Sequence, residues 1–335
     1  MPRNSLYLSI LAALAAAPAH ADHMEEVLVT ARHDSRTIDI TDALVISPDV
    51  AQLLKEAPGG NVNRNGPLTG IPQYRGMYGP RIATALDGNQ LAPSGPNWMD
   101  PPISYVVGSQ LESLEIYRGI APVSVAQESI GGAIDAKISK GNFGAGQDFE
   151  LAGRAIGSTQ SVNNGYNLNA SVYGSNNRHR LKLAALTEQG DDADFSGGTI
   201  TPTEYERQRY DIGYGFRTGG HTLQFDYGNN DTGDSGTPAL PMDIRYIRGD
   251  LYNFGYRFEA NAQTEVEMAI YGSELRHSMD NYRLRQPPGD ADNWRRNTAR
   301  SDNLGFRLQG TRRKALGVGR GSRRVDLGKT RRRQI

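Results

Sequence analysis

The strongest constraint on the fold is an alternation of apolar and polar residues with period two, which runs from about residue 147 to about residue 311. In the stretch 166–172 the even-numbered residues are Tyr, Leu, Ala and Val, and the odd-numbered residues are Asn, Asn and Ser. Because successive side chains of a strand point to opposite faces, this pattern predicts a strand with one apolar and one polar face. About eight such strands are expected, near residues 148–158, 166–172, 179–188, 210–216, 223–227, 252–258, 266–270 and 304–308.

Two antiparallel architectures share this alternation. A soluble sandwich turns its apolar faces inward, whereas a transmembrane barrel turns them toward lipid. The connections distinguish the two: short turns near 174–177, 218–220 and 260–263 alternate with long polar stretches near 189–204, 229–249 and 276–300. Outer-membrane barrels sort their connections in this way. Residues 147–311 therefore favour an antiparallel transmembrane β-barrel, and the chain as a whole is expected to be mainly β.

The composition excludes several other classes. The 335 residues include 39 Gly and 16 Tyr but no Cys, so disulfides, a cysteine nucleophile and a zinc ribbon are ruled out. The 37 basic residues balance the 37 acidic ones, which argues against a chain that binds nucleic acid along its whole length. The length corresponds to about two domains.

The N-terminus has the pattern of an export signal. Arg3 precedes the apolar run Leu6–Ala17, which is too short for a stable membrane anchor and ends near the small-residue site Ala19–Ala21. We expect a signal peptide at residues 1–21; the alternative is a buried N-terminal helix. Residues 22–34 follow as an N-terminal segment that contains a short β-prone stretch.

Residues 35–141 differ from the rest and predict a small α+β domain. A short amphipathic helix is expected at Asp49–Glu56, ended by the Pro-Gly-Gly sequence 58–60. A strand at Ile82–Leu86 runs into an Asp-Gly turn. A helix-like segment is expected at Val106–Leu114, with strands at 114–119 and 131–137.

Six short motifs in this domain carry a resemblance to a known family: Arg75-Gly76, Gly79-x-Arg81, Asp87-Gly88, Asp100-x-Pro102, Leu114–Gly119 and Gly131–Ile134. In this order and spacing they resemble the plug domain of TonB-dependent outer-membrane receptors, and the similarity covers residues 25–140. The resemblance implies a plug domain followed by a transmembrane barrel. It assigns the plug-motif residues Arg75, Gly76, Arg81, Asp87, Gly88, Arg118, Gly119, Gly131 and Gly132.

The same resemblance gives the N-terminal segment a role. It implies that Glu26, Val27, Leu28, Val29 and Thr30 form the TonB box, which pairs as an added strand with the periplasmic protein TonB. Such pairing suits a β-prone segment near a chain end. The alternative is a frayed N-terminal strand.

Two stretches, 95–105 and 236–243, are similar to the copper-linked branch of these receptors. The resemblance implies that Met99 of the plug and Met242 of an outer loop offer thioethers to Cu(I), a soft ion. This chain lacks the cysteine of that branch, and Leu240 stands where a histidine would precede Met242. The alternative is ordinary methionine packing. Copper would be a transported ligand, with an iron chelate as second candidate, and no cofactor is expected.

Other charged and polar motifs give weaker signals. Arg75, Arg81 and Arg118 could pair with acidic residues and hold the plug in the barrel, or could be ordinary surface charges. Gly233–Gly236 matches four residues of a protease nucleophile signature, which we interpret as a chance turn. The sequence contains no zinc-type histidine pair and no phosphate-binding loop, so we expect no enzyme.

The alternation of apolar and polar residues does not continue to the C-terminus. Plugged outer-membrane transporters have about 22 strands, and a barrel of about eight strands has no room for a plug. Residues 312–335 are strongly basic, with Asp326 as the one acidic residue, and show no strand pattern. A basic patch for nucleic acid or anionic lipid, a disordered tail, and a frameshift or early stop after Gly310 are the alternatives; we favour the last.

These observations lead to one functional expectation. The chain is expected to be a TonB-dependent outer-membrane receptor for energy-coupled ligand uptake, in a truncated form. Its partners would be TonB, outer-membrane lipid and a small ligand or metal, and no nucleic acid. The alternative is a non-transporting envelope module that binds or signals through the plug-like domain.

Overall fold

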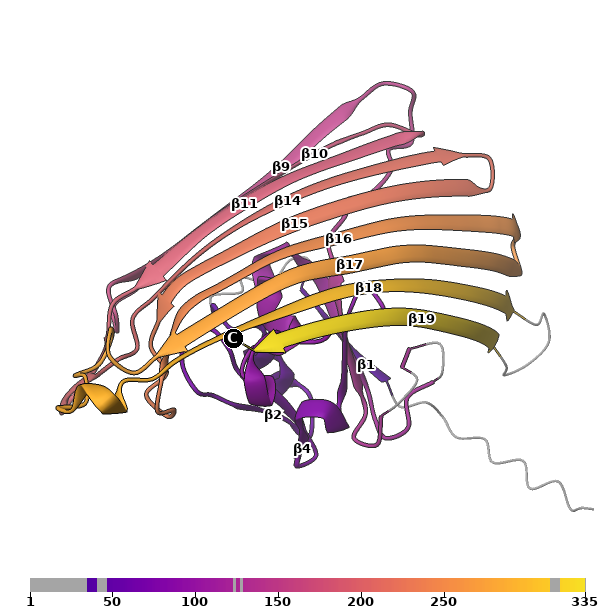
Figure 1. Cartoon of the computed structure of the whole chain (residues 1–335). Coiled ribbons are helices and arrows are strands. Elements are labelled where there is room, and N and C mark those ends of the chain that lie inside the picture. The colour runs from indigo at the N-terminus through magenta and orange to yellow at the C-terminus, as the bar shows by residue number, and fades with distance from the viewer. Residues whose placement is uncertain (1–34, 41–46, 123–124, 127–128, 314–319, 335) are drawn as a thin grey trace, which may run out of the picture. The chain divides into compact units, whose positions relative to one another are not determined.

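Nine antiparallel strands form the largest sheet of this computed structural model, which describes residues 35–40, 47–122, 125–126, 129–313 and 320–334. From one edge to the other, the strands follow in chain order (Figure 1). They are β9 Glu150–Gln160, β10 Gly165–Ser175, β11 His179–Gly190, β14 Tyr205–Thr218, β15 His221–Ser235, β16 Asp243–Asn261, β17 Thr264–Asp280, β18 Arg296–Arg313 and β19 Arg320–Gln334. The first eight correspond to the eight predicted stretches, although β9 begins two residues later than predicted. The expected signal peptide at 1–21 and the segment 22–34 lie outside the described residues.

The two faces of this sheet have opposite character. The side chains of Leu168, Ile212 and Phe254 are about half exposed, at 56%, 49% and 47%. Their neighbours on the other face, such as Asn169 and Asp211, are buried. A broad exposed apolar face is the arrangement of a membrane barrel and the reverse of a sandwich. The barrel-type prediction is therefore confirmed.

The basic C-terminal segment corrects one prediction. We expected residues 312–335 to lack a strand, but β19 pairs with β18 from Arg313↔Arg320 to Ala299↔Gln334. Antiparallel pairing uses backbone N–H and C=O groups, so a segment without apolar alternation can extend a sheet. The alternation of apolar and polar residues depends on the lipid-facing side chains. It therefore cannot predict a strand that joins the sheet through backbone pairing without such alternation.

The polar connections between the strands are shorter in the structure than the sequence predicted. β15 and β16 leave only residues 236–242 between them, and β17 and β18 leave residues 281–295, which contain the short helix η6 Ala291–Asn293. The connection between β11 and β14 carries a small hairpin, β12 Ala193–Phe195 and β13 Gly198–Ile200. Where a strand extends beyond the apolar band, both of its faces are polar. The alternation then stops before the strand does, so the sequence places the end of the strand too early.

The N-terminal domain, residues 35–138, holds two further sheets. A five-stranded sheet has the order β1-β7-β8-β5-β6, in which β5 and β8 are parallel. Its strands are β1 Ser35–Asp39, β5 Ala83–Leu86, β6 Asn89–Gln90, β7 Leu111–Tyr117 and β8 Ala133–Ile138. The three-stranded sheet consists of β2 Gly60–Asn63, β3 Ile71–Tyr74 and β4 Met77–Tyr78.

The helices of this domain are short 3₁₀ helices: η1 Val50–Glu56, η2 Gly79–Arg81, η3 Pro96–Trp98, η4 Pro102–Tyr105 and η5 Gly108–Gln110. The predicted helix at 49–56 is confirmed as η1, with the Asp49 side chain accepting a hydrogen bond from Ala51 N. The helix-like segment expected at 106–114 is wrong. Only η5 is helical there, because residues 111–117 pair on one side with β1 and on the other with β8. None of the described helices has the length and apolarity to cross a lipid bilayer.

Candidate functional site

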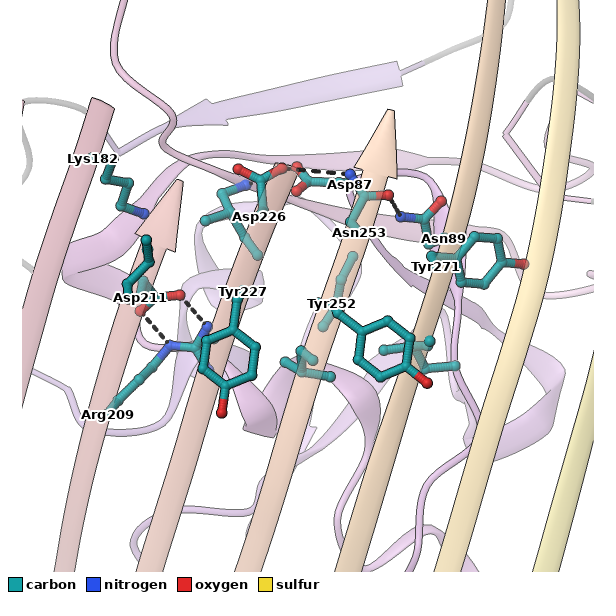
Figure 2. A pocket seen from close by; sticks show the side chains of 17 residues that line it. Asp87, Asn89, Lys182, Arg209, Asp211, Asp226, Tyr227, Tyr252, Asn253 and Tyr271 are labelled. Atoms are coloured by element: carbon teal, nitrogen blue, oxygen red, sulfur yellow. Dashed lines mark hydrogen bonds and ion pairs between the residues drawn. The ribbon is translucent and has the colours of Figure 1, made fainter. Parts of the chain in front are cut away.

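Two buried arginines on β14 join the nine-stranded sheet to the N-terminal domain. The Arg209 guanidinium donates to Asp211, with Nη2–Oδ1 at 2.5 Å and Nε–Oδ2 at 2.9 Å (Figure 2). It also donates to Gln110 Oε1 at 3.1 Å and to the Tyr105 carbonyl. Arg209 is 1% exposed. Its charge is therefore matched by one carboxylate and by polar groups of the N-terminal domain.

Arg207, one inward position earlier on the strand, repeats this arrangement. Its guanidinium pairs with Glu188 of β11 and donates to the Pro48 carbonyl at 2.5 Å. Both charged side chains are buried. A buried charge pair needs further hydrogen bonds to be tolerated, and here the N-terminal domain supplies them. The sequence analysis assigned no role to either arginine.

The predicted Asp87-Gly88 turn is a third contact. The Asp87 carbonyl accepts from Arg307 Nη1 of β18 at 3.0 Å, and Lys140 Nζ lies 3.3 Å from Asp87 and 3.7 Å from Asp226. Gly88 has φ of +75°, which favours glycine, and its N–H donates to Asp135. This plug-motif pair thus forms the tight turn expected of it and touches the sheet.

The cavity beside this turn is small. It is lined by Asp87 and Asn89 from the N-terminal domain and by Asp226, Tyr252 and other side chains of the sheet (Figure 2). Its volume is about 50 Å³. Ligand pockets usually measure about 300–1,000 Å³. The region is therefore a packed contact between the two parts, held by Asn89 Nδ2 donating to Asn253 Oδ1 at 3.1 Å.

A cavity of ligand size lies at the end of the sheet that carries the longer connections. Its volume is about 540 Å³. The lining comes from residues 64–67 of the N-terminal domain, from the turn after β9, from the β12–β13 region and from Pro238 and Ala239. This volume falls in the range of small-molecule sites.

Met99 and Met242, the two predicted thioether ligands, pack against one hydrophobic cluster that includes Ile244 and Met279. Met99 follows η3, and the Met242 carbonyl accepts from Thr237 Oγ1 at 2.6 Å. This cluster has 26 buried members from the plug and the sheet, so both methionines border the same core. Their assignment as metal ligands stays a prediction. Among the described residues, no three His, Cys, Asp or Glu side chains gather to form a metal site.

The loop that carries Met242 is fixed by Arg285. The Arg285 guanidinium donates to both Asp243 carboxylate oxygens at 2.6 Å and to the Leu240 carbonyl at 2.8 Å. Asp243 also accepts from Thr237 N at 2.8 Å. Bidentate pairs of this kind fix geometry as well as contributing energy. Residues 237–243 are therefore held in one conformation.

Asp100, beside Met99, is the centre of a buried network that the sequence did not predict. Its carboxylate accepts from Ser94 Oγ at 2.7 Å, Gly95 N at 2.6 Å and Tyr105 Oη at 2.8 Å. The Nδ1 atom of His277 on β17 lies 3.3 Å from Asp100 Oδ2. Burial alone would raise the pKa of Asp100, but the His277 ring and the hydrogen bonds lower it below its usual range.

The remaining plug-motif residues lie in turns of the N-terminal domain. Gly132 has φ of +111°, and a Cβ there would lie 2.4 Å from the Tyr117 carbonyl oxygen, so only glycine fits. Arg81 lies over the Tyr78 ring at 5.9 Å. The backbone φ angle is also positive at Arg75, Gly76 and Gly119. Gly131 N donates a hydrogen bond to the Arg81 carbonyl, and Arg118 directly follows β7.

The protease-like motif does not bring its serine close to His221. Ser235 ends β15 and His221 begins it. Fourteen residue steps of a strand separate them by about 45 Å. A serine nucleophile needs its histidine within hydrogen-bond reach. The interpretation as a chance sequence match agrees with this geometry.

Comparison with known proteins identifies the N-terminal domain. Residues 39–133 match the family model of the TonB-dependent receptor plug domain. This segment is a TonB-dependent receptor plug domain. The comparison with curated proteins gave no match.

Three solved structures extend the likeness beyond the plug. The copper transporter OprC aligns with TM-score 0.80 and 22% identity over 90% of this chain and 46% of OprC. The hemophore receptor HasR from Serratia marcescens aligns with TM-score 0.74 and 17% identity, over 90% and 45% of the two chains. The ferric enterobactin receptor PfeA from Pseudomonas aeruginosa aligns with TM-score 0.62 and 16% identity, over 91% and 50%. The plug and the nine-stranded sheet therefore have the fold of TonB-dependent receptors. The chain spans about half the length of these structures.

Proposed function

We propose that this chain belongs to a receptor that takes up a ligand across the outer membrane with energy supplied through TonB. The observation that carries the proposal is the plug domain seated on the polar face of a sheet whose other face is apolar and exposed. Hydrogen bonds from Arg207, Arg209 and Arg307 to backbone carbonyls hold the plug there. A plug in this position closes the passage through the barrel until the plug moves.

The exposed rings of the sheet support an outer-membrane location. Aromatic side chains gather where the strands meet the short turns, with His179 5.2 Å from Phe216 and His221 4.6 Å from Phe258 between ring centroids. Outer-membrane barrels carry aromatic girdles at the edges of their apolar band. The short turns would then face the periplasm and the longer connections the outside.

A longer barrel is part of the proposal. β9 and β19 are the two outer strands of the nine-stranded sheet, and unpaired strand edges are costly in lipid. We therefore propose that further strands complete the barrel in the intact receptor. Translating the gene in all three frames downstream of codon 310 tests this. Alternating strands in another frame would support a shortened receptor, and their absence would favour the envelope module.

Copper is the ligand that we propose first, with an iron chelate second. Two features support copper: the likeness to a copper transporter, and the position of Met99 and Met242 against the same hydrophobic core. Thioethers are soft ligands that select Cu(I). The Asp100 network and the Arg285–Asp243 pair fix the two segments that carry these methionines.

We expect Met99→Leu to weaken Cu(I) binding by the purified protein at least about tenfold, because a lost ligand should cost no less than a lost outer-shell partner. Leucine keeps the volume of methionine, so packing is retained. The measurement is a Cu(I) titration against a competing chromophoric chelator. Met268→Leu is the matched control, since Met268 is exposed on the apolar face. Equal affinities of Met99→Leu and the unsubstituted protein would remove Met99 from the site.

A further inference from the structure

Two histidines at the end of the large sheet that carries the short turns form the same cluster twice. The first, His179, begins β11. Its Nδ1 atom lies 2.9 Å from the Tyr214 hydroxyl, and its ring lies 5.2 Å from the Phe216 ring between centroids. Tyr214 and Phe216 belong to β14, the neighbour of β11 in the sheet (Figure 1). We call these three side chains the first rim cluster.

The second rim cluster consists of His221, Tyr256 and Phe258 on the neighbouring strands β15 and β16. The Nδ1 atom of His221 lies 2.7 Å from the Tyr256 hydroxyl, and the rings of His221 and Phe258 are stacked with centroids 4.6 Å apart. Each of these residues stands 42 positions after its counterpart in the first rim cluster. In both clusters the phenylalanine faces the histidine in the strand register. This repetition of residue types and spacing indicates one shared role.

Both rim clusters lie on the outward, apolar face of the sheet. Side chains two residues apart on a strand share a face. On β11 the residues that follow the histidine on its face are Leu181 and Leu183, and on β15 they are Leu223 and Phe225. All four are exposed. Each rim cluster is therefore the polar end of an exposed apolar stripe, which is the pattern that an amphipathic molecule would match.

Each histidine has a ring nitrogen, Nε2, that is free to donate a hydrogen bond. Among the residues that the structure describes, no side chain or backbone group is bonded to Nε2 of either ring. A tyrosine hydroxyl that donates to Nδ1 leaves the proton of the neutral imidazole on Nε2, and the protonated ring carries a proton on both nitrogens. Arg178 and Arg217 are exposed beside the first rim cluster, whereas Glu259 is exposed beside the second. We therefore expect the first to bind an anionic group more tightly.

The level of the rim clusters in the membrane identifies the occupant. In outer-membrane barrels the aromatic girdles mark the two edges of the apolar band, and the short turns face the periplasm. Both rim clusters lie at the short turns, so the lipid beside them belongs to the periplasmic leaflet. A phospholipid in that leaflet would place its phosphate next to the Nε2 donors and its acyl chains along the apolar stripes.

We propose that the two rim clusters are binding sites for phospholipids of the periplasmic leaflet, in which histidine Nε2 donates to the lipid phosphate and the tyrosine hydroxyl positions the imidazole. This inference rests on the proposed outer-membrane location and is independent of the copper ligand. It assigns two defined headgroup sites to a part of the sheet that otherwise only marks the edge of the apolar band.

Native mass spectrometry of the purified full chain in detergent, titrated with phosphatidylglycerol, counts the retained lipids and gives their Kd. His179→Phe and His221→Phe each keep an aromatic ring but remove the donor. We expect each to raise the Kd of one lipid at least about tenfold, because hydrogen bonds to charged groups are among the stronger ones. Tyr210→Phe is the matched control: Tyr210 is exposed on the same face of β14 as Tyr214 but lies further from the turn, so lipid retention should not change.

Two further probes separate the headgroup from the acyl chains. Diacylglycerol carries the same chains without a phosphate, and inorganic phosphate carries no chain. We expect the unsubstituted protein to bind each of them at least about tenfold more weakly than phosphatidylglycerol, because each lacks one of the two contacts. Diacylglycerol retained as tightly as phosphatidylglycerol would overturn the role of the histidines.

The outcomes also separate these sites from the proposed location. If the unsubstituted protein inserts into phospholipid vesicles but both histidine variants retain phosphatidylglycerol as it does, the location stands and the sites are overturned. If the unsubstituted protein does not insert, the location and the sites fail together. If a histidine variant does not fold, Tyr214→Phe and Tyr256→Phe decide, since they remove the hydroxyl that positions each ring: unchanged lipid retention in both would overturn the sites.

Discussion

Cells whose receptor lacks residues 25–31 are expected to take up no ligand, although the purified variant binds that ligand with unchanged affinity. The deletion removes Glu26–Thr30, which we propose to be the TonB box. Strand addition depends on backbone hydrogen bonds, so without this segment TonB has no strand to pair with. The proposed ligand residues lie elsewhere in the chain, and binding should persist. Uptake is measured as cell-associated copper and binding as the Kd for Cu(I).

A matched pair of point variants sharpens this test. Leu28→Pro removes a backbone donor and should block pairing, whereas Leu28→Val keeps both the donor and the β propensity and should support uptake. Outer-membrane fractions must contain equal amounts of each protein, which also checks the proposed location. Undiminished uptake by the deletion variant would contradict a role in energy coupling and favour the envelope module.

Arg209→Ala is expected to destabilise the folded protein by about 3–5 kcal/mol, because it leaves a buried charge without its partner. Asp211 is buried and would lose both of its hydrogen bonds from the guanidinium. The Gln110 side chain and the Tyr105 carbonyl of the plug would lose a donor as well. Denaturant unfolding in detergent micelles, followed by circular dichroism, gives the free energy of unfolding.

An exposed ion pair of the same sheet provides the control. Arg248 and Asp231 are 61% and 48% exposed, so Arg248→Ala should cost less than about 1 kcal/mol. Replacing both Arg209 and Asp211 by leucine should restore much of the stability, since no charge is then left unpaired. A cost for Arg209→Ala no larger than that for Arg248→Ala would show that the buried pair does not hold the plug.

The sequence predicts those parts of the fold that a local pattern marks, such as a repeating change in side-chain polarity or a glycine turn. The strands were predictable because lipid-facing residues such as Leu168 and Phe254 alternate with polar ones over eight segments. β19 was not, since it joins the sheet through backbone pairing without that alternation. The Asp87-Gly88 turn was predictable because glycine tolerates positive φ.

The contacts between the plug and the sheet could not be predicted in this way. Arg209 and Tyr105 are 104 residues apart in the chain, and the residues around each of them give no indication that the two are hydrogen-bond partners. The Asp100–His277 contact joins residues 177 positions apart for the same reason. Met99 and Met242 came from motif resemblance alone, and their role as metal ligands stays a prediction.

The placement of β1 has a mechanical consequence. Among the described residues, β1 is the outer strand of the plug sheet and pairs in that sheet with β7, through the residue pairs from Ser35↔Tyr117 to Asp39↔Ser113. Any tension applied to the chain before residue 35 reaches this strand first, and an edge strand can detach without tearing the rest of its sheet. The segment around Tyr105 and Gln110, gripped by a buried guanidinium, comes much later along the chain. Tension on the N-terminus would therefore load β1 before the segment that Arg209 holds.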